Sequence, residues 1–377
     1  MHQKGTNPKK VLDELRIIQK HNQQYETGKI LCSMCTKPHP IAKKAYTLFF
    51  ESNLGDTGLF PATAQLEQET ITQLADLLNC KTAEGFIVSG GTEANLLALT
   101  AARNQTQKAE PEVILPESAH FSFTKACNLL KIQPKYAPLD NNFRVKPYEV
   151  ESLVNKNTIA IVATAGSAEL GAIDPIESIS EIAENNKINF HVDAAFGGLI
   201  IPFLPKNSPK FDFQLSGVTS ITVDPHKMGM AAIPTGGILF RSKKMLNHLK
   251  TETPYLSTNS QYTLTGTRSG ASAASAWAVF NALGQEGYRK IVRRCLSNTE
   301  YLVGQIHNLG FKLLCKPELN VFAFQTQNTK EFAEKLWKKG WCISYIPRYE
   351  CIRVVVMPHI KRVHAKAFAT ALKTEKL

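Results

Sequence analysis

Short runs of β-branched and apolar residues alternate with helix-forming stretches between residues 85 and 241, and this alternation is the feature that most limits the fold. Strands separated by helices usually form a mostly parallel sheet with helices on its faces. Such a sheet is buried on both faces, so its strands are near-continuous apolar runs, as in residues 159–163. The predicted strands are 85–89, 112–115, 159–164, 188–192, 220–223 and 237–240. This part of the chain is therefore predicted to be a doubly wound α/β domain.

The regions on either side of this alternation have different patterns. The N-terminal region is partly helical and is interrupted by Pro38 and Pro40, which is typical of an arm that lies on another surface. An Ala-rich helical stretch follows Gly270, and after it come a second helical stretch at 288–309 and a strand, helix and strand near 320–325, 330–339 and 351–357. We therefore expect an arm of residues 1–50, a large domain of residues 51–284 and a smaller C-terminal α+β domain of residues 285–377.

The charge of the chain limits its partners. The 377 residues include 44 Lys and Arg against 32 Asp and Glu, which gives a formal net charge of +12. The basic residues are dispersed and form no nucleic-acid-binding motif, so we expect no nucleic-acid partner. No uncharged apolar run approaches the roughly 18 to 20 residues that a membrane span needs, and the polar start resembles no signal peptide. We therefore expect a cytoplasmic protein with no membrane partner.

The cysteines do not predict a disulfide framework or a metal site. Eight cysteines in a chain of 377 residues are sparse and scattered, which favours reduced thiols. Cys32 and Cys35 form one C-x-x-C pair, but a tetrahedral zinc site needs a second pair of ligands that the sequence lacks. We expect no metal, and we expect these two cysteines to be buried or to lie near the active site.

A glycine-rich segment follows the strand predicted at 85–89. It reads Ser-Gly-Gly-Thr-Glu-Ala-Asn over residues 89–95 and leads into an apolar helix. Gly90 and Gly91 allow close approach of the backbone, and the start of a helix offers unpaired N–H groups and a positive dipole end. A phosphate group is the expected ligand, with Thr92 expected to cap the helix and donate its hydroxyl. Alone, the segment is equally consistent with an ordinary strand-to-helix turn.

Two further segments complete a cofactor site. Asp193 ends the strand predicted at 188–192, where open α/β sheets bind ligands, and Ala195 follows it. Lys227 follows His226 at the end of another strand, where an amine of lowered pKa can form a Schiff base. A phosphate cradle, a strand-end carboxylate and such a lysine are the parts that hold pyridoxal 5′-phosphate. Asp193 would keep the pyridine nitrogen protonated, and Lys227 would bind the aldehyde.

His120 is a candidate for a fourth contact with this cofactor. It follows the strand predicted at 112–115, and its imidazole could stack on the pyridine ring opposite Ala195. The alternative is a surface or helix-capping histidine. Together with the three preceding segments, the position favours stacking.

These residues resemble the group II pyridoxal-phosphate decarboxylases, and in particular their archaeal members that act on tyrosine or aspartate. The resemblance extends over nearly the whole chain. It rests on the cradle, on the segments around Asp193 and Lys227, and on further matching stretches at 33–40, 53–56, 59–61, 265–270 and 353–359. It implies the fold of the aspartate aminotransferase superfamily (fold type I of the pyridoxal-phosphate enzymes), a homodimer and active sites shared between the two subunits.

The same resemblance implies an activity and further site residues. The expected reaction is decarboxylation of an L-amino acid, most readily L-tyrosine to tyramine and/or L-aspartate to β-alanine, with release of carbon dioxide. Tyramine would serve methanofuran biosynthesis, and β-alanine would serve coenzyme A biosynthesis. The resemblance assigns phosphate binding to the Arg268 loop, from the same subunit or from the neighbouring one. It assigns substrate-carboxylate binding to Arg353, for which a surface salt bridge is the alternative. Tyr255 and Tyr262 are its candidates for the acid that returns a proton to Cα.

Two other functions are consistent with parts of the sequence. A cysteine desulfurase of the same fold would need a nucleophilic cysteine on a downstream loop, and Cys342 is available. Such enzymes usually have Gln where this chain has Ala195, which counts against this reading. A non-enzymatic binding protein would explain the net charge but none of the four segments above.

Overall fold

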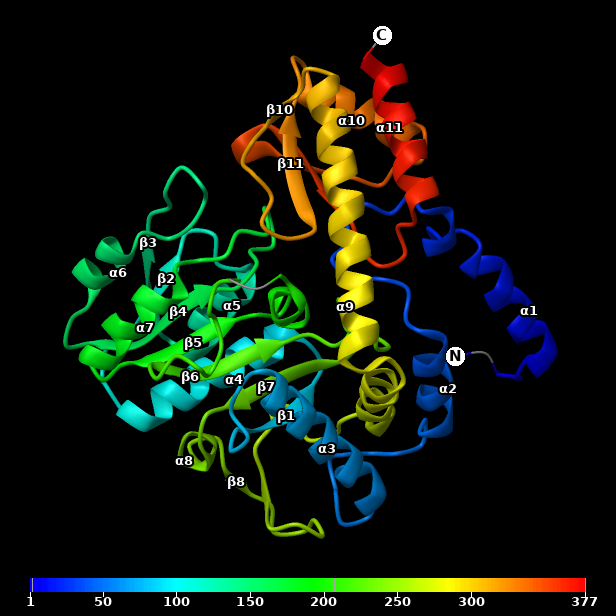
Figure 1. Cartoon of the computed structure of the whole chain (residues 1–377). Coiled ribbons are helices and arrows are strands. Elements are labelled where there is room, and N and C mark those ends of the chain that lie inside the picture. The colour runs from blue at the N-terminus through cyan, green and yellow to red at the C-terminus, as the bar shows by residue number, and fades with distance from the viewer. Residues whose placement is uncertain (2, 206–207, 377) are drawn as a thin grey trace.

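In the computed structural model, which describes residues 1, 3–205 and 208–376, one sheet has the strand order β1-β7-β6-β5-β4-β2-β3 (Figure 1). Its strands are β1 (Glu84–Val88), β2 (Glu112–Pro116), β3 (Gln133–Ala137), β4 (Thr158–Thr164), β5 (Asn189–Asp193), β6 (Val218–Val223) and β7 (Gly236–Phe240). Strands β3, β2, β4, β5 and β6 are parallel to one another, whereas β7 is antiparallel to both β1 and β6. The prediction of a mostly parallel sheet is confirmed, and each predicted strand lies within two residues of an observed one.

Strand β3 was not predicted from the sequence. It lies at the edge of the sheet, and most of its residues are partly or fully exposed. Pro134 lies inside it, and an edge strand tolerates proline because one side of its backbone has no neighbouring strand. The strand therefore lacks the apolar run that identified the buried strands.

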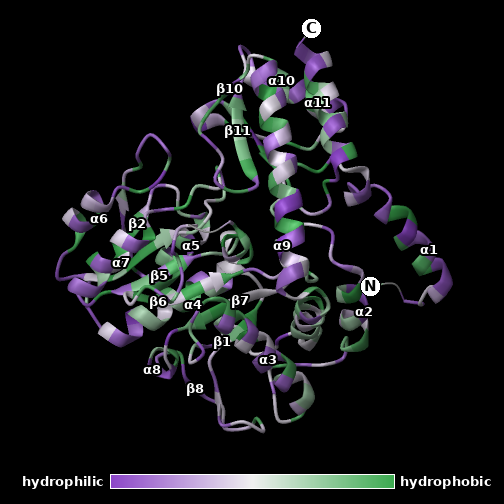
Figure 2. Ribbon diagram, in the orientation of Figure 1, coloured by the Kyte–Doolittle hydropathy of each residue, from purple (hydrophilic) through white to green (hydrophobic). Residues whose placement is uncertain are grey.

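Both faces of the sheet are covered by helices. Along β4, Ile161 and Ala163 pack in one cluster with Ile179 of α7 (Ile176–Asn185), whereas Val162 packs on the other face with Leu99 of α4 (Gly91–Thr106). Successive side chains of a strand point to opposite faces, so a strand buried on both sides must be apolar throughout. Figure 2 shows the resulting apolar colouring of β5 and β7.

The other helices of this part of the chain lie around the sheet. They are α3 (Pro61–Leu77), α5 (Phe121–Leu130), α6 (Pro147–Leu153) and α8 (Lys243–Asn247). A short hairpin of β8 (Thr251–Glu252) and β9 (Ser260–Gln261) extends below the sheet in Figure 1.

The long helix α9 (Gly270–Asn308) leads from the large sheet to a second, smaller one (Figure 1). Gly284 interrupts it with φ 55° and ψ −176°, so the helix consists of two segments that meet at an angle. The second sheet has the order β10-β11-β13-β12 and is antiparallel. Its elements are β10 (Lys312–Leu313), β11 (Val321–Gln325), β12 (Ser344–Ile346), β13 (Cys351–Val355), α10 (Thr329–Lys338) and α11 (Arg362–Lys376). This is the expected smaller α+β unit.

The N-terminal region contains α1 (Pro8–Gln19) and α2 (Pro40–Leu48). Helix α2 packs against α9, whereas α1 extends away from the rest of the chain and has no buried residue (Figure 1). Several apolar side chains of α1 are 40–60% exposed: Val11, Leu12, Leu15, Ile17 and Ile18. Within the described residues, no helix is both long and apolar enough to cross a membrane.

Candidate active site

Most of the predicted site residues meet in one cavity of about 380 Å³ at the carboxyl ends of β4, β5 and β6. Those that line it are Gly90, Gly91, Thr92, His120, Asp193, Ala195, His226 and Lys227. The carboxyl ends of parallel strands are where open α/β sheets bind ligands. A larger open groove of about 1170 Å³ lies over the small sheet, and Lys330 and Glu334 are among its surface residues. It contains none of the predicted site residues.

The glycine cradle has no room for side chains. Gly90 has φ 156° and ψ 179°, and a Cβ on Gly91 would lie 3.1 Å from Asp224 Oδ2 and 3.2 Å from Ala195 Cβ. A Cβ on Gly236 of β7 would lie 2.4 Å from Gly90 Cα. Helix α4 begins at Gly91, so its first N–H groups have no helical acceptor and face a cavity that suits an anion.

The expectation that Thr92 caps this helix is wrong. Gly90 is the N-cap residue and makes no side-chain capping bond, and Thr92 lies one position inside the helix. The backbone N–H of Ser89 donates a hydrogen bond to Glu93 Oε2 at 2.8 Å. Thr92 still lines the cavity, so its hydroxyl remains available to a ligand.

Lys227 lies in a tight turn after β6, and 19% of its side chain is exposed. Its Nζ lies 3.1 Å from Asp224 Oδ2. Burial acts to lower the pKa of Lys227, but the carboxylates of Asp224 and Asp193 outweigh it and raise the pKa above its usual value. The predicted lowering of this pKa is therefore wrong, because Asp193 and Asp224, the latter only three residues before Lys227, lie close enough to the amine to favour its charged form.

Asp193 ends β5 and is 5% exposed. Its Oδ1 accepts the backbone N–H of Ala195 at 3.1 Å, and its Oδ2 accepts Asn95 Nδ2 at 2.9 Å. Both oxygens keep a free lone pair, so the carboxylate can bind a protonated ring nitrogen in the cavity. Asn95 was missed as a site residue, although one amide within the apolar helical run 94–99 is a signal that the sequence contains.

His120 has the helix-capping role that the sequence left open, and its position is also compatible with the predicted stacking. It is the N-cap of α5, where its Nδ1 accepts the N–H of Ser122 at 3.2 Å, and its ring also lines the cavity. Burial lowers the pKa of His120, so the imidazole is neutral near pH 7. A neutral ring with a fixed orientation suits stacking on an aromatic cofactor.

His226 is also fixed. Its Nδ1 lies 2.6 Å from the carbonyl oxygen of Thr235, so this nitrogen carries the hydrogen and donates it. The imidazole lies beside Gly90, because a Cβ added to Gly90 would lie 3.2 Å from His226 Cε1.

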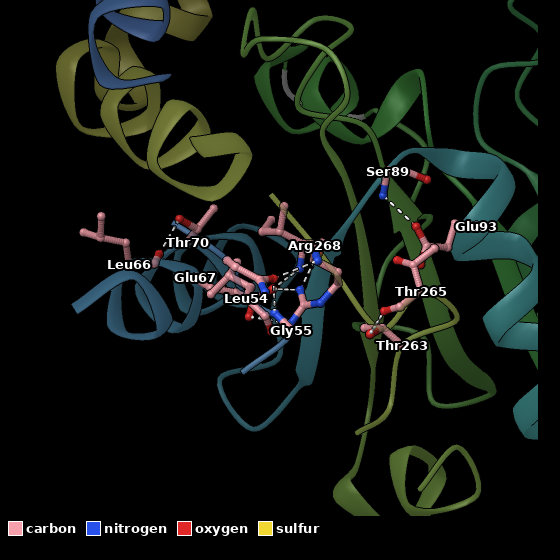
Figure 3. A network of polar contacts seen from close by, with 12 residues as sticks. Leu54, Gly55, Leu66, Glu67, Thr70, Ser89, Glu93, Thr263, Thr265 and Arg268 are labelled. Carbon is pink, nitrogen blue, oxygen red and sulfur yellow. Dashed lines mark hydrogen bonds and ion pairs between the residues drawn. The ribbon is translucent and has the colours of Figure 1, made fainter. Parts of the chain in front are cut away.

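Arg268 does not face the cradle. Figure 3 shows its guanidinium directed at Glu67, with which it forms a buried ion pair. The same group donates to the carbonyl oxygens of Ile87 at 2.8 Å and Leu54 at 3.2 Å. The side chain therefore joins the 53–55 segment to α3 and β1, and the phosphate contact predicted for it is not present in this arrangement. Glu67 was not identifiable from the sequence, because it lies 201 positions from Arg268.

Three other predicted residues lie outside the cavity. Tyr255 is 85% exposed beside the β8–β9 hairpin, and Tyr262 stacks on Phe86 with ring centroids 5.7 Å apart. Arg353 lies on β13, where it donates to the carbonyl oxygen of Cys32 at 2.8 Å and to Ser344 Oγ at 3.3 Å. Burial lowers the pKa of Arg353 to about 10. None of the three contacts the groups around Lys227 within this chain.

The cysteines do not supply a nucleophile to the cavity. Cys342 is 2% exposed and lies in a backbone bridge to Ile30, and burial raises the pKa of its thiol. A desulfurase needs an accessible thiolate, so this alternative is not supported. Burial also raises the pKa of Cys35, whose thiol lies close enough to Lys227 and Asp224 to interact with their charges.

The cradle, Asp193 and Lys227 therefore fit pyridoxal 5′-phosphate, and the fold and cavity define a pyridoxal-phosphate enzyme of fold type I. Residues 51–327 match the model of the pyridoxal-dependent decarboxylase conserved domain. The chain belongs to this family, and it is a pyridoxal-phosphate-dependent amino-acid decarboxylase.

Curated relatives and solved structures agree with this assignment. The chain is 47% identical over 358 residues to a probable L-aspartate decarboxylase of Archaeoglobus fulgidus, covering 95% of this chain and 97% of that protein. It is 49% identical over 345 residues to a probable L-tyrosine/L-aspartate decarboxylase of Methanothermobacter thermautotrophicus, covering 90% and 95%. Among solved structures, a sphingosine-1-phosphate lyase of Burkholderia pseudomallei superposes with a TM-score of 0.92 at 27% identity, covering 100% of this chain and 92% of that one.

Proposed function

We propose that this decarboxylase acts on L-tyrosine, L-aspartate or both, producing tyramine and β-alanine. The observation that carries the proposal is the high identity over nearly the whole chain to relatives named for these two substrates. Under the same proposal the enzyme is cytoplasmic, and its products enter methanofuran and coenzyme A biosynthesis.

The residues of the cavity have distinct roles in this proposal. The N–H groups at the start of α4 and the Thr92 hydroxyl hold the phosphate, and Lys227 Nζ is the amine that binds the aldehyde. When bound, pyridoxal 5′-phosphate supplies a cationic ring that accepts the electrons released when the carboxyl group leaves. Asp193 would keep the ring nitrogen protonated through a charge-assisted hydrogen bond, and His120 and Ala195, which line the same cavity, would contact the ring.

The proton that replaces the carboxyl group needs a donor. We retain Tyr255 for this role, because its exposed position leaves the phenol free to reach the site of a second subunit. Tyr262 is a weaker candidate, since its ring packs on Phe86. Arg353 is retained as the substrate-carboxylate ligand, because only its Nη1 is bonded to Cys32 and Ser344 and its buried Nε has no partner among the described residues.

The substrate is tested by measuring carbon dioxide release from L-tyrosine, L-aspartate and L-glutamate in parallel with the cofactor-loaded enzyme. We expect release from tyrosine, aspartate or both, at a kcat/KM at least about tenfold above that for glutamate, because glutamate is one methylene longer than aspartate and lacks the aromatic ring of tyrosine. Equal inactivity on tyrosine and aspartate would refute the substrate assignment while leaving the family assignment intact.

The homodimer with shared active sites is supported by the exposed side of α1. An apolar helix face in water usually marks a surface that another chain covers, and here none of the residues of α1 is buried by the part of the chain that the structure describes. Charged residues in place of Leu15 and Ile18 should therefore weaken association. We expect the Leu15→Glu/Ile18→Glu variant to shift from dimer to monomer in size-exclusion chromatography with light scattering, and a Lys9→Ala control to remain dimeric. A variant that stays dimeric at micromolar concentration would show that α1 is not part of the interface.

A further inference from the structure

Asn95 lies in the first turns of α4 and is 1% exposed. Its amide nitrogen faces one pair of polar residues and its amide oxygen faces another, and these four residues come from three different elements of the fold. A buried carboxamide can donate two hydrogen bonds and accept two, and any bond left unmade costs free energy. The arrangement around Asn95 uses all four.

The two donors of the amide bind side chains near the cavity. Nδ2 donates to Asp193 Oδ2 at 2.9 Å and to Ser122 Oγ at 3.0 Å. The reversed amide would place its oxygen against the Asp193 carboxylate, so the orientation is determined by the charge of Asp193. Asn95 thus holds the carboxylate oxygen that Ala195 does not hold.

The amide oxygen accepts from the interior. Thr222 Oγ1 donates to Asn95 Oδ1 at 2.8 Å, and His191 Nε2 lies 3.0 Å from the same oxygen. Burial lowers the pKa of His191 to about 4, so the ring is neutral and has one N–H. That hydrogen must be on Nε2, because Nε2 faces an acceptor, and Nδ1 then accepts from Ser220 Oγ at 2.8 Å.

The second donor connects Asn95 with His120. Ser122 Oγ accepts from Asn95 and lies 2.9 Å from His120 Nδ1, to which it donates. His120 Nδ1 also accepts the backbone N–H of Ser122, so its hydrogen is on Nε2. One amide therefore contacts Asp193 directly and His120 through a single hydroxyl.

We propose that Asn95 is a positioning residue of this decarboxylase, whose amide nitrogen holds the Asp193 carboxylate in place with one hydrogen and, through Ser122, the His120 ring in one tautomer with the other. Bonds accepted by the Asn95 oxygen polarise the amide and strengthen the bonds that its nitrogen donates. The inference rests on the proposed roles of Asp193 and His120 in binding the cofactor. The ionisable groups facing this network are His191, Asp193, His120, Asp224 and Lys227.

The test compares Asn95→Ala with Asn95→Asp, using the affinity and visible absorbance of added pyridoxal 5′-phosphate as well as kcat. We expect Asn95→Ala to weaken cofactor binding by about 10- to 100-fold at every pH, because a hydrogen bond to a charged group is lost. In Asn95→Asp, two carboxyl groups face each other and one holds its proton to a higher pH than usual. Below that pH the protonated group donates to Asp193 as the amide does, and above it the two anions repel.

The loss of cofactor affinity in Asn95→Asp should therefore become smaller as the pH is lowered from about 8 to about 6, whereas the loss in Asn95→Ala should not change with pH. Asn104→Asp, on the exposed side of the same helix, is the matched control and should bind the cofactor as the native protein does. Equal, pH-independent losses in the two Asn95 variants, or native binding in both, would overturn the proposal.

Two milder variants keep the test valid if the Asn95 variants do not fold. Thr222→Val removes one donor to the amide oxygen and should weaken cofactor binding by about two- to tenfold. Ser122→Ala removes the hydroxyl between Asn95 and His120 but leaves the Asp193 contact in place, and it should also weaken cofactor binding. Native binding in both would also overturn the proposal. Asp193→Asn distinguishes the proposed role of Asp193 from that of Asn95. If it leaves the cofactor affinity unchanged, the proposed role of Asp193 fails. If only Asp193→Asn weakens binding, the role of Asn95 fails alone.

Discussion

Replacing Lys227 by alanine is expected to lower the rate of decarboxylation by at least about 10³-fold, because the amine that binds the aldehyde of the cofactor is lost. The visible absorbance that depends on a covalent bond to this amine should disappear, although the cradle can still bind the phosphate. Carbon dioxide release and absorbance after addition of pyridoxal 5′-phosphate measure the two effects. Lys210→Ala, which alters an exposed ion pair with Glu177, is the control and should retain native values.

Removing this amine also leaves Asp224 buried without its ion-pair partner, so a loss of stability must be separated from a loss of chemistry. Lys227→Arg keeps a positive charge beside Asp224, but a guanidinium is always protonated and cannot bind the aldehyde. We expect Lys227→Arg to unfold close to the native temperature and to be as inactive as Lys227→Ala. Covalent cofactor attachment in either variant would refute the assignment of Lys227.

Disruption of the buried pair between Glu67 and Arg268 is expected to have the largest effect on stability. The free energy of unfolding should fall by about 3–5 kcal/mol in Glu67→Gln or Arg268→Met, because each variant leaves one buried charged or polar group without its partner. Urea denaturation of the cofactor-free protein measures this change. Disruption of the exposed pair between Lys210 and Glu177 should change it by no more than about 1 kcal/mol.

The same pair of variants tests what Arg268 does. If its guanidinium only joins the 53–55 segment to α3 and β1, Glu67→Gln and Arg268→Met should weaken cofactor binding to a similar extent. A loss confined to Arg268→Met would instead support the phosphate contact that the sequence predicted. Stability equal to that of the native protein in both variants would contradict the structural role.

The sequence predicted the buried strands because burial on both faces requires apolar residues at successive positions, as in β4. It also brought Gly90, Asp193 and Lys227 together, since each follows a strand and strand ends of a parallel sheet meet at one edge. Local sequence pattern could not predict β3, because most of its residues are partly or fully exposed. It also could not predict the ion-pair partner of Arg268, which lies far away in the sequence.

The pKa of Lys227 was outside the reach of sequence analysis for a related reason. Whether burial or nearby carboxylates prevail depends on distances of a few ångströms from the amine to Asp224, three residues earlier in the chain, and to Asp193 on a different strand. Asn95 is an intermediate case: its amide in an apolar helical run is visible in the sequence, but its four partners come from β5, β6 and the start of α5.

The position of β7 between β1 and β6 affects how the two ends of a ligand can be held. Because β7 lies between β1 and β6, the strand that leads to the phosphate cradle and the strand that leads to the lysine are two strand spacings apart, about 9–10 Å. Gly236 keeps the intervening strand low enough for Gly90 to cross over it. The turn after β1 therefore reaches the end of β6, where a Cβ on Gly91 would lie 3.1 Å from Asp224 Oδ2, and that oxygen lies 3.1 Å from Lys227 Nζ. An anion and a carbonyl of one molecule can thus be held side by side by segments that start from strands with a third strand between them.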